Sequence, residues 1–168
     1  MNTILIESPR MLYHTDIALV FQALDGRQNE FNWLLTGFEG HGVGKSWGVT
    51  LPDIFDGEPQ LIRGEELSRI VETINIQFIW GCLSGFGPEV VLDPCNLEVE
   101  PWADGNPMFW KEGVSPQHPR ATVEIVCFDS SLTLLLSKDR DLSRRFCAFF
   151  PECRDLDEEN RARQQRDR

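Results

Sequence analysis

Apolar residues recur at two different spacings along this chain, and the two spacings predict a mixture of helices and strands. Three segments place apolar residues three and four positions apart, which is the spacing of one helix face. The predicted helices cover residues 15–24, a stretch around Leu67–Ile74, and residues 139–150. A Thr-Asp pair before the first helix and Asp25-Gly26 after it are typical start and stop signals.

Shorter runs that are rich in branched and aromatic residues predict strands. The predicted strands cover residues 3–7, 31–36, 47–51, 76–80, 96–102, 121–128 and 132–136. The glycine-rich segment Gly37–Ser46 lies between two of these runs and predicts a long, flexible hairpin connection. Residues 103–119 predict a loop because turn-forming residues dominate them.

The order of these elements predicts an α+β fold. Because the connections between strands are often hairpin-like, we expect a mostly antiparallel sheet with about three helices packed on one face. The length of 168 residues is that of one domain, which we expect to cover residues 1–156. Residues 157–168 are almost wholly charged and polar, and we expect them to form a disordered tail.

Charge is distributed unevenly along the chain, and this distribution bears on the kind of partner that we expect. The net charge is −11, and residues 52–110 hold eleven acidic residues against two basic ones. Such a stretch argues against direct binding to nucleic acid or to an anionic membrane, and it is compatible with a basic protein partner.

Because no apolar run approaches the ~20 residues of a membrane span and the N-terminus lacks signal-peptide features, a cytoplasmic location is expected. Five irregularly spaced cysteines favour buried, reduced thiols.

Two glycine-rich motifs superficially suggest chemistry. Gly40–Ser46 resembles a phosphate-binding loop, but Glu39 stands where that loop needs a glycine, and a strand rather than a helix is predicted to follow. Gly81–Gly85 resembles a nucleophile elbow, but Leu83 stands where the nucleophile belongs. Whether the Gly37–Ser46 loop binds a ligand and whether any cysteine is reactive stay open.

Metal and acid–base chemistry have little support in the sequence. Glu98 and Glu100 share one side of a predicted strand, an arrangement that is commoner on a solvated face than in a catalytic pair. The three histidines are scattered and no Cys-x-x-Cys pair occurs. We therefore predict no cofactor, no metal and no catalytic residue.

Aromatic residues within the acidic stretch suggest a protein-binding surface. Trp102, Phe109 and Trp110 lie in or beside turn-rich sequence, and aromatic residues ringed by charge of one sign are typical of binding hot spots. The predicted partner-binding residues are Glu98, Glu100, Trp102, Asp104, Phe109 and Trp110.

Four segments carry a resemblance to small bacterial proteins. They are Phe31–Leu35, Gly64–Leu67, Ile76–Gly81 and the hairpin strand Glu124–Ser131 with the helix after it. Their layout resembles the immunity proteins encoded beside polymorphic toxins. This resemblance implies a bacterial cytosolic protein that blocks one toxin by binding it, and it implies no catalytic residue.

Three functional hypotheses follow. The first is a non-enzymatic binding module, an immunity-type inhibitor whose acidic surface fills the basic cleft of a toxin domain. The second is a small enzyme whose site is assembled by the fold from Cys82, His41 and Asp53. The third is a structural or oligomeric module with a self-complementary apolar face.

Overall fold

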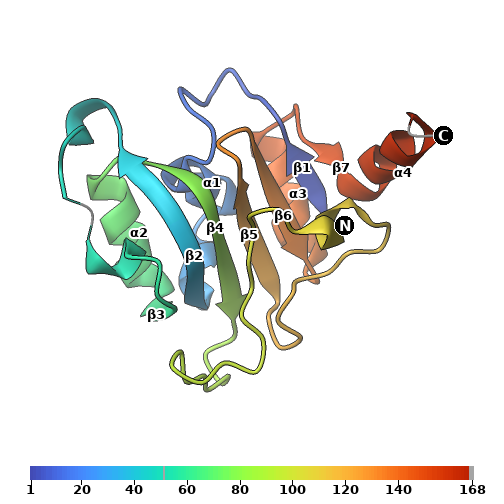
Figure 1. Ribbon diagram of the computed structural model, residues 1–168. Coiled ribbons are helices and arrows are strands. Elements are labelled where there is room, and N and C mark those ends of the chain that lie inside the picture. Colours follow the sequence, from blue (N-terminus) through green and yellow to red (C-terminus); the bar gives the residue numbers. More distant parts are fainter. Residues whose placement is uncertain (51, 167–168) are drawn as a thin grey trace.

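A seven-stranded antiparallel sheet forms the centre of the computed structural model, which describes residues 1–50 and 52–166 (Figure 1). The strand order is β3-β2-β4-β5-β6-β1-β7. The strands are β1 (Thr3–Leu5), β2 (Asn32–Gly42), β3 (Gln60–Arg63), β4 (Ile76–Phe86), β5 (Val123–Phe128), β6 (Leu132–Ser137) and β7 (Arg154–Asp155). The first and last strands of the chain therefore pair with each other at one edge of the sheet, and β3 forms the opposite edge.

Three helices pack on one face of this sheet, which confirms the predicted α+β fold. They are α1 (Ile17–Leu24), α2 (Gly64–Thr73) and α3 (Arg140–Phe149). Their apolar stripes form one core with every second residue of the central strands, such as Trp33, Leu83 and Ile125. The indole N–H of Trp33 donates to the Gln28 carbonyl at 2.9 Å, so this buried ring leaves no polar group unpaired.

The helix boundaries follow from short polar side chains. Asp16 precedes α1, and its carboxylate accepts a hydrogen bond from the Leu19 amide at 3.2 Å. Asp139 caps α3 in the same way, accepting from the Asp141 amide at 2.8 Å. Asp25 ends α1 in the left-handed conformation, with φ of 54°.

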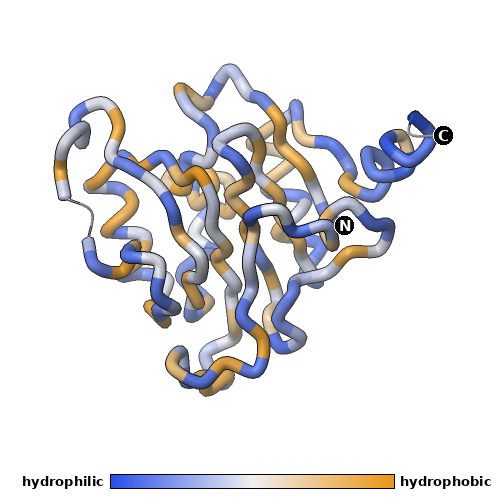
Figure 2. The backbone as a smooth tube through the Cα atoms, viewed as in Figure 1, coloured by the Kyte–Doolittle hydropathy of each residue, from blue (hydrophilic) through white to orange (hydrophobic). Residues whose placement is uncertain are grey.

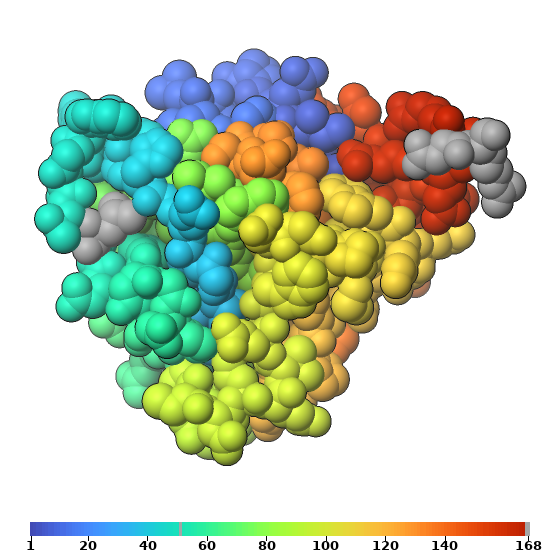
Figure 3. Space-filling model, viewed as in Figure 1, coloured from blue at the N-terminus to red at the C-terminus, as the bar shows by residue number. Residues whose placement is uncertain are grey.

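The opposite face of the sheet is covered by an irregular segment, residues 87–122, which we call the outer segment. Its only regular element in the described chain is a short 3₁₀ turn, η4 (Pro107–Trp110). Apolar residues of the outer segment, including Ala103 and Phe109, pack on Cys82, Val126 and Leu134 of the sheet. In the space-filling view the outer segment spreads in yellow-green and yellow over the visible face (Figure 3).

The predicted hairpin around Gly37–Ser46 is wrong. Strand β2 continues through Gly37 to Gly42 and pairs with β4 across a bulge, and η2 (Gly44–Ser46) follows it. The glycines serve close packing, because a Cβ at Gly40 would lie 2.7 Å from the Gln77 carbonyl oxygen. No strand forms over Trp47–Thr50, and residue 51 lies outside the described residues. Strand β3, which follows η3 (Asp53–Phe55), pairs with β2 instead.

The predicted strand over residues 96–102 is also wrong. Residues 96–102 are irregular and lie on the face of the sheet, not at its edge. Leu97 packs against the sheet and Pro101 is buried, while Glu98 and Glu100 point to solvent. The alternation of apolar and charged residues is therefore real, but it comes from a chain segment that rests on a sheet rather than joining one.

The C-terminal segment forms a helix, in contrast to the expected disordered tail. Helix α4 (Leu156–Arg166) projects from the sheet edge beside β7 (Figure 1). It is coloured almost wholly as hydrophilic in Figure 2. It is anchored by Leu156, which is fully buried, and by Asn160, whose amide donates to the carbonyls of Phe109 (2.8 Å) and Lys111 (3.0 Å). The polar composition of this segment did not predict a docked helix, because only two of its residues are buried and hold it in place.

The cysteines differ from the expectation of reduced thiols. Cys147 and Cys153 form a disulfide with a Cα–Cα distance of 5.6 Å, whereas Cys82 and Cys127 are free and buried and Cys95 is free and exposed. The pair meets because α3 ends between them and the chain turns at Pro151, which brings the backbone within the range that a disulfide spans.

Shortening the buried anchor of α4 tests whether this helix belongs to the folded core. We expect Leu156→Ala to lower the free energy of unfolding by about 3 kcal/mol, since it leaves a cavity beneath α4. Gln164→Ala, at an exposed position on the same helix, should change it by less than about 0.5 kcal/mol. Urea denaturation measures both values, and equal stability of the two variants would contradict a docked α4.

Candidate protein-binding surface

Gln117 is the hydrogen-bonding centre that ties the outer segment to the sheet. Its backbone amide and its side-chain amide donate to the two oxygens of Glu124 on β5, at 3.1 and 3.0 Å. Its side-chain oxygen accepts from the Trp102 amide at 3.2 Å and from the Asn106 side chain at 2.9 Å. One glutamine therefore joins two distant stretches of the outer segment to a single buried carboxylate.

The Glu124 carboxylate is fully buried and has no cationic partner among the described residues. The Ser84 hydroxyl donates to it at 3.0 Å, in addition to the two bonds from Gln117. Burial raises the pKa of Glu124 above its ordinary value of 4.5, and these hydrogen bonds oppose the rise without cancelling it. A buried polar group of this kind fixes one arrangement of its partners, because any other arrangement leaves donors unpaired.

Further anchors hold the outer segment along its length. The Thr36 hydroxyl donates to the Pro101 carbonyl at 2.7 Å, and this bond is buried. The Gly113 amide donates to the Asp157 carboxylate of α4 at 2.8 Å, next to the Asn160 bonds described above. The amide of Asn2 donates to the Val114 carbonyl. The outer segment is therefore fixed to β2, β5, α4 and the residue before β1, despite having almost no secondary structure.

The solvent side of the outer segment is acidic with a few apolar side chains. Four of the six predicted partner-binding residues are exposed there: Glu98, Glu100, Trp102 and Asp104. The outer segment carries six acidic residues against two basic ones, and the Arg120 side chain is engaged with the Val91 carbonyl at 3.3 Å. Trp102 is 46% exposed, so much of its ring is available to a partner.

The other two predicted residues lie deeper than expected. Phe109 is fully buried against the sheet, so it supports the surface from beneath instead of forming it. Trp110 is half-buried, with its ring 5.1 Å from that of Phe128 and the Arg163 guanidinium 4.3 Å above it. Both aromatic residues follow Pro107 and Met108 in a turn-rich sequence, where the local pattern could not distinguish a core anchor from an exposed ring.

Sequence reasoning missed two exposed apolar residues on the outer segment. Val91 is 83% exposed and Met108 is 47% exposed. Neither has a periodic pattern around it, and the neighbouring Val90 and Leu92 are packed inward. Together with Trp102, Val91 and Met108 are the exposed large apolar side chains of the outer segment. We use the name acidic face for the exposed residues Val91, Asp93, Glu98, Glu100, Trp102, Asp104 and Met108.

The alternative enzymatic residues are not gathered into a site. Cys82 pairs across the sheet with Thr36, and His41 lies five positions further along β2, roughly 16 Å away at strand spacing. Cys82 is fully buried next to the Gln117 amide, and burial raises the pKa of its thiol. Asp53 is exposed in η3. His41 lines an open cavity of about 430 Å³ with Trp47, but no thiol or carboxylate is among the described residues that line it.

No protein-family model, curated protein or solved structure matches the chain. Residues 1–50 and 52–166 contain no cluster of three or more His, Cys, Asp or Glu side chains arranged to hold a metal ion. Within the same residues, every helix is too short or too polar to cross a membrane.

Replacing Glu124 tests the hydrogen bonds between Glu124, Gln117 and Ser84 through the pH dependence of stability. Because folding raises the pKa of Glu124, its contribution to stability is complete below about pH 4.5 and is lost as the pH rises through the folded pKa. The wild-type free energy of unfolding should fall by at most about 1.4 kcal/mol per pH unit from this group. Glu124→Gln should lack this component because its amide does not titrate, and its NH2 group, which cannot accept, replaces an oxygen that accepts from Gln117 or Ser84, at a cost of about 1–3 kcal/mol.

The measurement is urea denaturation of both proteins from acidic to neutral pH. The difference in stability between them should narrow as the pH rises. Glu100→Gln, at an exposed position, is the control that should keep the wild-type pH profile. Parallel profiles for wild type and Glu124→Gln would contradict a titrating, buried Glu124.

Proposed function

We propose that the chain is a non-enzymatic protein-binding module whose acidic face docks onto a basic protein. The observation that carries this proposal is the anchored outer segment: a surface with almost no regular structure is nevertheless held in place by hydrogen bonds to buried groups of the sheet. A surface that is ordered before binding loses less conformational entropy when a partner arrives.

The composition of the acidic face suits such a partner. Apolar side chains that include a tryptophan can enter pockets, while the surrounding carboxylates steer a cationic protein and speed its association. The resemblance to immunity proteins makes the proposal more specific: the partner is a toxin domain whose basic cleft the acidic face blocks. The placement of Cys82 and His41 far apart favours binding over the enzymatic alternative.

The test is co-expression of the full chain with the product of the neighbouring gene, followed by co-purification and kinetic binding measurements. We expect a complex at low ionic strength whose association rate falls with added salt. Glu98→Lys with Glu100→Lys should lower the association rate about tenfold. Trp102→Ala should weaken the affinity about tenfold, mainly through faster dissociation.

The matched control reverses the same number of charges on the helix face. Glu66 and Glu72 are exposed on α2, so Glu66→Lys with Glu72→Lys changes the net charge equally but leaves the acidic face intact. If the control pair slows association as much as the test pair, net charge and not the acidic face determines binding. If the neighbouring product forms no complex at low salt, the immunity-type role is wrong.

A further inference from the structure

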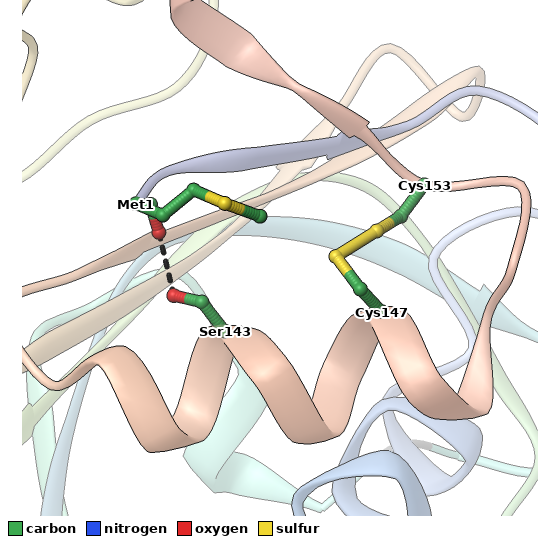
Figure 4. Close-up of a disulfide and its surroundings, with 4 residues drawn as sticks. All are labelled: Met1, Ser143, Cys147 and Cys153. Carbon is green, nitrogen blue, oxygen red and sulfur yellow. Dashed lines mark hydrogen bonds between the residues drawn. A yellow bond between two sulfur atoms is a disulfide. The ribbon is translucent and has the colours of Figure 1, made fainter.

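The Cys147–Cys153 disulfide lies at the surface end of α3, where it joins that helix to the residue just before β7 (Figure 4). Both cysteines are partly exposed. A partly exposed disulfide that closes a short loop can be reached by thiols from solution more readily than a fully buried one.

Cys147, one half of this disulfide, lines a cavity of about 530 Å³. The described residues that line it are Met1, Arg140, Ser143, Arg144, Cys147 and Asp155. Cys153 is not among them, so only one of the two cysteines borders the cavity. The volume lies within the range of small-molecule sites.

The charges around the cavity are of both signs. Arg140 is exposed and forms no ion pair within residues 1–50 and 52–166. The Arg144 side chain is 78% exposed, and its guanidinium group forms an ion pair with the Asp141 carboxylate. Asp155 is half-buried and accepts a hydrogen bond from the Glu158 amide at 3.1 Å. The residues that line the cavity with Cys147 therefore include two arginines, one of them paired with Asp141, and one aspartate.

We propose that this cavity is a thiol–disulfide exchange site for a small thiol that carries carboxylates and an ammonium group, the chemical class of glutathione. The two guanidinium groups suit its carboxylates, and Asp155 suits its ammonium group. The inference goes beyond the proposed binding function and does not depend on it.

The exchange begins when the thiolate of the small molecule attacks the Cys147 sulfur. A new S–S bond forms there, the Cys147–Cys153 bond breaks, and its electron pair leaves on Cys153, which takes a proton from water. A second thiolate then attacks the mixed disulfide. This step releases the oxidised small thiol as its disulfide and leaves Cys147 as a thiolate, so the protein gains two electrons and two molecules of thiol are oxidised.

The first experiment compares reduction of the full-length oxidised protein by glutathione and by uncharged 2-mercaptoethanol, at equal thiolate concentrations. Quenching with an alkylating agent and measuring intact mass gives both rates. We expect Arg140→Gln and Arg144→Gln each to slow glutathione about threefold relative to 2-mercaptoethanol. Arg166→Gln, on exposed α4 away from the cavity lining, is the matched control and should leave the ratio unchanged.

The second experiment tests which sulfur is attacked. Cys153→Ser leaves Cys147 free, and Cys147→Ser leaves Cys153 free, so the two variants lack the same bond. On incubation with oxidised glutathione, the Cys153→Ser variant should form the mixed disulfide at least about fivefold faster. Circular dichroism confirms that both variants are folded. Each rate with oxidised glutathione is normalised by dividing it by the rate of the same variant with the neutral disulfide of 2-mercaptoethanol.

Three results would overturn the proposal. The purified, air-oxidised protein could show two alkylatable thiols at Cys147 and Cys153, so that no disulfide exists to exchange. The arginine variants could leave the ratio of the two reduction rates unchanged. The two serine variants could take up glutathione at equal normalised rates.

Discussion

Two apolar faces on one sheet are the constraint on which the rest of this structure depends. The central strands bury alternate residues on both sides, so each face needs a cover. Helices cover one face with their apolar stripes. The other face is covered by an irregular segment, whose backbone groups cannot pair with one another as those of a helix do. That cover is stable only where the rest of the domain and its own side chains supply hydrogen bonds, and the buried Glu124 carboxylate accepts two of them from Gln117.

This requirement links the core to the candidate surface. Gln117 connects the carboxylate on β5 to Trp102 and Asn106, so the position of an exposed tryptophan is set by a buried glutamate. Helix α4 contributes from the other end through Asn160 and Asp157. The acidic face is therefore not a loose loop with charges on it. Its shape is part of the packing of the domain, which is why a protein-binding role is physically reasonable for a segment without regular structure.

The sheet edge formed by β1 and β7 carries a chemically different feature, the disulfide. The terminal strands β1 and β7 pair beside the end of α3, and the disulfide joins α3 to β7 across a short turn. The segment that leaves this edge becomes α4, which holds part of the outer segment. The disulfide and the acidic face are thus connected through one series of contacts, by way of β7, α4 and the outer segment.

The sequence alone determined the elements whose signals are local. Helices α1, α2 and α3 follow from apolar spacing, and Asp16 and Asp139 mark two of their starts. The β5–β6 hairpin and the acidic charge of the middle region were also readable, and Glu98, Glu100, Trp102 and Asp104 are exposed as expected. Each of these depends on residues within a few positions of one another.

Tertiary structure decided everything that depends on distant partners. Gly40 lies in a strand because β4 approaches it closely, and residues 96–102 form no strand because they rest on a sheet face. Phe109 is buried, although its local sequence resembles that of an exposed turn, because it meets the sheet beneath it. α4 is held by two buried residues in a segment whose average composition is that of a solvated tail. In each case the deciding contact is remote in sequence, so no local pattern could reveal it.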